Sequence, residues 1–225
     1  MQNCTFRMAV AEFLGVFGIV FLGCGYVVVF STTYGLIGIA LAFGLVVGSL
    51  VVCFGKVSGA HINPAVTFML WATGRFPHVS AGVYLIAQLL GGIAGAAALK
   101  GLADPAKWQA AAGGSTGLKA GLGAGAGFAI EFGLTFLLVA SIFVVALHPR
   151  RGRYGALAVG AVVALDVMLG APLTGASMNP ARTVGPALLH GAWADHWVYW
   201  AGPLLGAVAA ALVFGRSSPA EPEAD

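Results

Sequence analysis

Long apolar segments dominate this sequence and restrict the folds that it can adopt. The first of them runs from Met8 to Phe30 and contains one charged residue, Glu12. A helix of this length exceeds the roughly 20 residues that are needed to cross the hydrocarbon core of a bilayer. Because 59% of the residues are apolar and only 8% are charged, the chain cannot form an ordinary water-soluble surface. The sequence therefore predicts an integral membrane protein.

Six apolar segments are long enough to cross a membrane, and two others are too short. The short ones, about 64–73 and 180–190, each begin at a proline. We expect both to be re-entrant half-helices, because lipid-exposed backbone cannot be left without hydrogen-bond partners. The predicted fold class is an all-α membrane protein with six transmembrane helices and two half-helices. The crossings are expected near 8–30, 35–55, 79–100, 122–147, 155–173 and 197–215.

The chain contains an internal repeat. Gly59–Thr67 matches Gly175–Thr183 at six of nine positions, and both segments contain Asn-Pro-Ala. Glu12 and Glu131 also lie at similar places in the first span of each half. Because each half has three spans, the second must enter the membrane from the opposite side, and the repeat is inverted. The expected organisation is one channel domain over 1–225, repeats over about 8–100 and 122–215, and a disordered tail over about 217–225.

The Asn-Pro-Ala motifs mark the points where a loop becomes a half-helix. A proline at the first helical position loses no hydrogen bond, and the preceding asparagine can cap the helix. Inverted half-helices would bring their positive ends together near the middle of the bilayer, where the two amides face a passing oxygen and cations are repelled. A single motif would favour mere helix capping, but two inverted copies favour a pore for neutral solutes. The expected lining residues are Asn63, Pro64, Ala65, Asn179, Pro180 and Ala181.

On these motifs the sequence resembles the aquaporin, or major intrinsic protein, family, from about Ala9 to Gly215. The resemblance implies a passive channel with one pore per subunit, arranged as a homotetramer in a lipid bilayer. It implies conduction of water and of small uncharged solutes such as glycerol, with exclusion of protons and ions. Undissociated metalloid acids, urea or ammonia are the alternative solutes.

The resemblance also implies an outer selectivity filter made of Phe43, Val167, Ala176 and Arg182. Arg182 would lie inside the membrane, where an unpaired guanidinium is costly and indicates a function. Water-selective members usually carry histidine in place of Val167, so valine beside the small Ala176 predicts a wider and less polar constriction. The Val/Ala pair resembles nodulin-like plant channels and their bacterial relatives, although these tend to have tryptophan in place of Phe43.

Other positions resemble water channels instead. The glycerol-facilitating branch typically has aspartate after the arginine and a basic residue four positions later, whereas this chain has Thr183 and Ala187. Tyr199-Trp200 also resembles the water-channel pattern, although Tyr199 can equally belong to an aromatic belt at the membrane interface. The solute range therefore stays open.

Three kinds of polar residue remain in the apolar segments. The resemblance implies that Glu12 and Glu131 accept hydrogen bonds from the loops that precede the half-helices, and the alternative is a proton-coupling acid. His61 is expected to line the inner vestibule, unless it only satisfies hydrogen bonds of its own loop. Asp166 has no assigned role.

Several function classes are disfavoured. We find no nucleophile with a base, metal-ligand cluster or phosphate-binding loop, so no enzyme, cofactor or metal site is expected, and nothing indicates nucleic-acid binding. A secondary active transporter is the main rival, but the central asparagines cannot titrate. The distribution of Lys and Arg favours cytoplasmic termini. Short termini without a targeting extension suggest a bacterial inner membrane.

Overall fold

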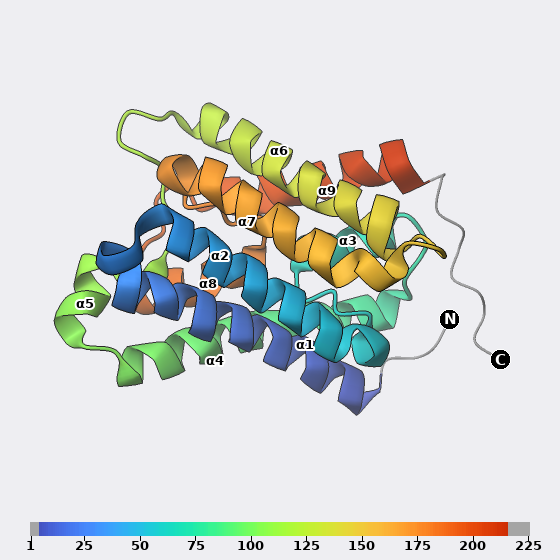
Figure 1. Cartoon of the computed structure of the whole chain (residues 1–225), viewed down its shortest axis with the longest axis horizontal. Helices are drawn as coiled ribbons and strands as arrows, with labels where there is room; N and C mark the ends of the chain where they lie inside the picture. The colour runs from blue at the N-terminus through green and yellow to red at the C-terminus, as the bar shows by residue number, and fades with distance from the viewer. Residues whose placement is uncertain (1–4, 216–225) are drawn as a thin grey trace.

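The computed structural model describes residues 5–215, and the tail expected at about 217–225 lies outside the described residues. The described part is a bundle of long helices that surrounds two short ones (Figure 1). The helices are α1 (Phe6–Gly18), α2 (Gly25–Ser58), α3 (Pro64–Ala72), α4 (His78–Leu102), α5 (Pro105–Ala110), α6 (Ala124–Ser141), α7 (Gly155–Thr174), α8 (Pro180–His190) and α9 (Val198–Phe214). Two segments are π-helical, η1 (Ile19–Cys24) and η3 (Ile142–Ala146). Two others are short 3₁₀ helices, η2 (Ala112–Gly114) and η4 (Gly152–Tyr154).

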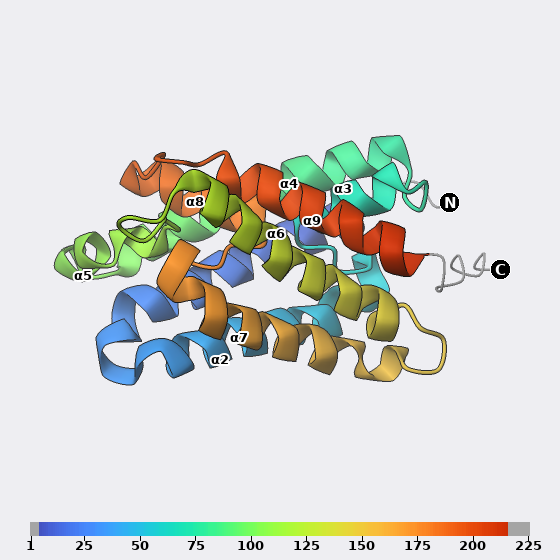
Figure 2. The same cartoon turned by 90° about the horizontal axis from the view of Figure 1, so that it is seen from above.

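All six expected crossings and both half-helices are present. The first two crossings form one helical stretch of 53 residues, Phe6–Ser58, which reverses direction at Gly35 (Figure 2). Gly35 has φ 60° and ψ −159°, a conformation open essentially only to glycine. The part of α2 before Gly35 therefore completes the first crossing, and the part after it is the second.

The two halves of the chain have opposite orientations. α1 begins and α9 ends at the same end of the bundle, while α5 and the connection between the halves lie at the other end (Figure 1). α3 enters from the first end and α8 from the second, so the two half-helices point toward each other (Figure 2). The inverted three-span repeat predicted from the sequence is therefore confirmed.

Small residues allow the two halves to approach closely. Where α2 packs against α7, a Cβ on Gly44 would lie 2.5 Å from the carbonyl oxygen of Gly160. A Cβ on Gly160 would meet the carbonyl oxygen of Gly44 at 2.6 Å. Helices in a membrane gain contact area through such small-residue interfaces.

The surface of the bundle is apolar, and its interior contains buried polar and charged side chains as well as a hydrophobic core. Leu41, Leu45 and Leu165 are exposed on the outside, whereas Glu12, Glu131 and other polar side chains are buried. This arrangement suits a protein that contacts lipid outside and polar solutes inside.

Candidate functional site

The N-termini of α3 and α8 meet through the side chains of Asn63 and Asn179. Asn63 Nδ2 donates to the carbonyl oxygen of Met178 at 2.8 Å, and Asn179 Nδ2 donates to that of Ile62 at 2.8 Å. The Oδ1 atoms cap the helices: Asn63 accepts from Ala65 N at 2.8 Å, and Asn179 accepts from the N–H groups of the two residues after Pro180. An amide nitrogen carries two hydrogens, so these contacts leave one N–H of each asparagine for a solute.

The loops before the half-helices adopt repeated, strained backbone conformations. Ala60 and Ile62 have φ of 47° and 41°, and the matching Ala176 and Met178 have φ of 47° and 54°. Positive φ is unfavourable for non-glycine residues and especially for β-branched isoleucine. Each such residue costs on the order of 1–3 kcal/mol and persists only where its surroundings impose it.

Buried carboxylates hold both strained loops. Glu12 on α1 accepts hydrogen bonds from His61 N at 3.0 Å and Ile62 N at 2.6 Å, and also from Ser58 Oγ and Gln88 Nε2. These contacts join α1, α4 and the loop before α3.

Glu131 on α6 repeats the arrangement in the second half. It accepts hydrogen bonds from Ser177 N at 3.0 Å, Met178 N at 2.9 Å and Thr174 Oγ1 at 2.7 Å. Ser177 occupies the position that His61 has in the first repeat. In the described chain Glu12 therefore accepts four hydrogen bonds and Glu131 accepts three, and most of these donors belong to the loop before a half-helix or to the last residue of the helix that precedes that loop.

His61 lies in the loop before α3, two residues before Asn63, and is buried. Its Nδ1 is 3.1 Å from Thr67 Oγ1, and its ring packs edge-on against Phe76 and Tyr84. All of these contacts of His61 are with residues of the first half of the chain, as expected for a histidine that satisfies the hydrogen bonds of its own loop.

Arg182 follows Asn179 on the first turn of α8 and is only 4% exposed. Its Nη1 donates to the carbonyl oxygen of Gly114 at 2.8 Å, and its guanidinium carbon lies 5.1 Å from the centre of the Phe43 ring. Nε is buried without a hydrogen-bond partner among residues 5–215. The guanidinium therefore keeps one donor that no described residue satisfies.

Phe43, Val167 and Ala176 are the three uncharged residues expected in the outer filter. Phe43 fills the space beside Gly23 in the π-helical turn η1, where a Cβ would lie 2.5 Å from the ring. Val167 and Ala176 are buried in the same hydrophobic cluster as Phe43. Phe43 of α2, Val167 of α7 and Ala176 of the loop before α8 thus belong to one buried cluster, and Phe43 contacts Arg182 of α8.

The sequence analysis missed several residues that hold this site. Gly114 supplies the carbonyl for Arg182, and Gln88 joins Glu12 to Thr67. Neither carries a sequence signal, because a carbonyl is common to all residues and Gln88 has no repeat-related glutamine.

The interfacial-belt interpretation of Tyr199 is wrong. Tyr199 is 1% exposed, and its hydroxyl donates to the carbonyl oxygen of Thr174 at 2.8 Å. Tyr84 makes the matching bond to the carbonyl oxygen of Ser58. The similar spacing of the two tyrosines from their motifs is a signal that could have revealed this pair.

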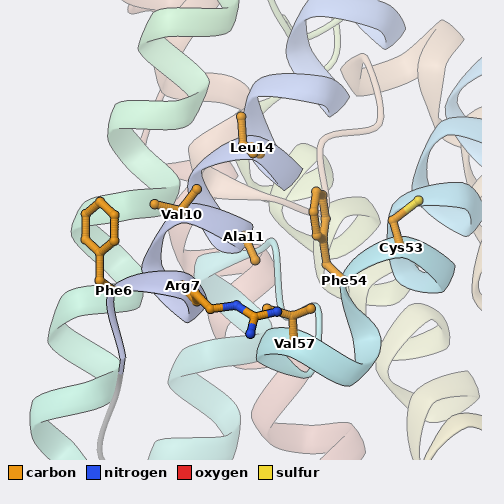
Figure 3. A pocket seen from close by; sticks show the side chains of 8 residues that line it. All are labelled: Phe6, Arg7, Val10, Ala11, Leu14, Cys53, Phe54 and Val57. Atoms are coloured by element: carbon orange, nitrogen blue, oxygen red, sulfur yellow. The ribbon is translucent and has the colours of Figure 1, made fainter.

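A separate groove on the surface is not part of this site. It lies between α1 and α2, has a volume of about 270 Å³, and is apolar apart from Arg7 (Figure 3). Its walls include Phe6, Leu14 and Phe54, so it offers polar solutes no hydrogen-bonded path.

Comparisons with known proteins agree with this architecture. The family model described as "Major intrinsic protein" matches residues 1–214. Aquaporin TIP4-4 of Zea mays is 44% identical over 220 residues, which cover 92% of this chain and 85% of the relative. Nodulin-26 of Glycine max is 39% identical over 211 residues, which cover 91% of this chain and 75% of the relative.

A mammalian relative and a solved structure extend the comparison. Aquaporin-2 of Ovis aries is 42% identical over 219 residues, covering 95% of this chain and 80% of the relative. The X-ray structure of the aquaglyceroporin from Plasmodium falciparum superimposes with a TM-score of 0.76 at 27% identity and covers 93% of each chain. This chain therefore belongs to the major intrinsic protein family and is a passive, multi-pass membrane channel rather than an enzyme.

Proposed function

We propose that the channel passes water and small uncharged solutes along a path between the facing N-termini of α3 and α8, and that it excludes cations and protons. The observation that carries this proposal is the pairing of Asn63 and Asn179 across the two repeats. Each amide keeps one N–H for an oxygen of the solute. The positive ends of both half-helices make the same point unfavourable for a cation.

The solute range is set at the outer filter of Phe43, Val167, Ala176 and Arg182. Arg182 donates to solute oxygens and adds a fixed positive charge. Val167 and Ala176 give the opposite wall no polar group and little bulk, which favours solutes larger than water, such as glycerol. The name of one similar solved structure, an aquaglyceroporin, points in this direction.

The remaining residues of the motifs and loops support the path. Pro64, Ala65, Pro180 and Ala181 form the first turns of the half-helices beside the asparagines. His61 contributes to the inner vestibule. Glu12 and Glu131 hold the strained loops in place and take no part in proton coupling.

The chain acts as one domain, and we propose that it assembles as a homotetramer with one pore per subunit. Basic residues gather at the end of the bundle where α1 begins, which favours a cytoplasmic location for that end. They are Arg7, Lys56, Arg75, Arg150, Arg151 and Arg153. The relatives named above come from plants and a mammal and a protozoan, so they support a membrane location without supporting a bacterial inner membrane.

Stopped-flow light scattering on proteoliposomes tests the channel. Purified protein should give water flux well above that of empty liposomes and measurable glycerol entry, without collapsing an imposed pH gradient. Water flux equal to that of empty liposomes, from protein shown to be inserted and folded, would contradict conduction of water. Collapse of the pH gradient would contradict proton exclusion.

Other neutral solutes form the second candidate class. The apolar wall of Val167 and Ala176 also suits undissociated metalloid acids, urea and ammonia, which need little from the wall beyond the donors on the Arg182 side. The same proteoliposomes, challenged with each solute in turn, distinguish these from glycerol.

A further inference from the structure

Asp166 is a buried acid for which the site described above gives no task. It lies on α7 directly before Val167 and is 3% exposed. Its Oδ2 atom is buried and has no hydrogen-bond partner among residues 5–215. Glu131 is close enough to interact with it electrostatically, which adds a like charge and no donor.

The lack of a donor separates Asp166 from the other two buried acids of the bundle. Glu12 accepts four hydrogen bonds and Glu131 accepts three. A carboxyl group buried in a membrane protein without a partner is costly, and such groups usually face a solute path. Where the protein supplies no donor, a water or solute molecule can supply one.

The face of α7 that carries Asp166 packs against α6 and the loop before α8. Gly170 lies four residues later and therefore on the same helix face. A Cβ on Gly170 would lie 2.5 Å from Leu134 of α6 and 3.2 Å from the Cβ of Ala176. Asp166 therefore lies one helical turn before the point where α7 meets Ala176, and directly before Val167.

The inverted repeat provides an internal comparison for this position. Leu50 precedes Asp166 by the same 116 residues that separate Asn63 from Asn179. Leu50 packs on α1, where its side-chain carbons lie 3.3 Å from the position of a Cβ on Gly18. The fold therefore accepts an apolar residue at this register, and packing does not require an acid.

We propose that Asp166 is a specificity-determining residue whose carboxyl group accepts a hydrogen bond from a solute hydroxyl or from pore water beside Val167. This inference rests on the proposed function and deepens it. Arg182 and the two asparagine amides offer donors to a solute, because the asparagine Oδ1 atoms are used in the helix caps. An acceptor on Asp166 therefore favours neutral solutes that carry several hydroxyl groups. Asp166 thereby provides the polar contact that Val167 cannot provide.

Permeability measurements on matched variants test the proposal. Asp166→Leu copies Leu50 and removes the acceptor, whereas Asp166→Asn keeps an acceptor oxygen of similar size. We expect Asp166→Leu to lower the ratio of glycerol to water permeability about fivefold, as loss of one hydrogen bond would, and Asp166→Asn to stay near wild type. An unchanged ratio in folded Asp166→Leu protein, as judged by size-exclusion chromatography, would overturn the proposal.

Accessibility of position 166 provides a second readout that does not depend on glycerol. In a chain with Cys4, Cys24 and Cys53 changed to serine, Asp166→Cys should make water flux sensitive to mercuric ion. Leu165→Cys is the control, because Leu165 is 63% exposed on the outer face of α7. Flux in Asp166→Cys that is as resistant to mercury as in the control would show that position 166 does not face the path. Failure of the wild type to conduct water or glycerol would instead contradict the proposed function itself.

Discussion

At the scale of single residues, each central asparagine has two tasks. Its oxygen caps its own half-helix, and one amide hydrogen binds a carbonyl oxygen of the other repeat. The direction of the remaining N–H is therefore fixed by residues that are more than 100 positions away in sequence. Capping alone, the simpler interpretation of either motif, leaves the two bonds between the repeats unexplained.

Val167 is the residue at which we expect solute size to be controlled. Val167→His should lower glycerol permeability severalfold and leave water permeability within about twofold, because a buried imidazole narrows the filter and adds a donor. Stopped-flow measurements on proteoliposomes give both values. Val167→Ala is the control in the opposite direction and should not reduce glycerol entry. Equal glycerol permeability in the histidine variant would place the constriction elsewhere.

Two substitutions of Arg182 should distinguish the effect of its charge from the effect of its planar shape. Arg182→Ala removes the fixed charge and leaves the Gly114 carbonyl without its donor, so we expect weaker exclusion of cations and altered solute selectivity. Arg182→Lys keeps the charge but lacks the planar group that reaches both Gly114 and the Phe43 ring. It should therefore retain cation exclusion while its solute selectivity changes. Electrical recordings and solute fluxes on the two variants measure these effects, and an equal cation leak in both would refute the assignment.

At the scale of elements, the loops before α3 and α8 depend on buried carboxylates. Glu131→Leu would leave the N–H groups of Ser177 and Met178 and the Thr174 hydroxyl without an acceptor, at about 1–3 kcal/mol each. We expect a large fall in apparent Tm in detergent, together with loss of water flux. Glu131→Gln retains one acceptor oxygen and should be affected less. A Glu131→Leu protein with wild-type Tm would mean that the loop is held by other contacts.

The sequence predicted the helices correctly wherever a long apolar segment or the internal repeat marked them. The spans, the half-helices and the positions of the two glutamates follow from apolar length and from the matched motifs. The π-helical turns η1 and η3 lie within uniformly apolar helices, so their residues carry no mark of the wider turn. The Gly114 carbonyl was missed because its contact with Arg182 depends on how a loop folds back over α8.

At the scale of the whole molecule, the apolar exterior does not by itself show oligomerisation. Lipid can cover Leu41, Leu45 and Leu165 as well as a neighbouring subunit can. The homotetramer therefore needs its own measurement. Native mass spectrometry of protein extracted in mild detergent should give a mass four times that of the 22.7 kDa chain. A predominant monomer or dimer that conducts at the full rate would contradict a tetrameric channel.

The path itself should be complete within one subunit, because Asn63, Asn179 and Arg182 all come from the same chain. Val167→Trp places a bulky ring in the filter and should block water flux in a folded subunit. When wild type and Val167→Trp are coexpressed and reconstituted as mixed oligomers, we expect water flux to fall in proportion to the blocked fraction. In a pore shared by several subunits, one blocked chain would close the whole path. Water flux would then fall more steeply than the fraction of wild-type chains. Linear dependence on the wild-type fraction, measured by stopped-flow on vesicles of equal protein content, would therefore locate one independent pore in each copy.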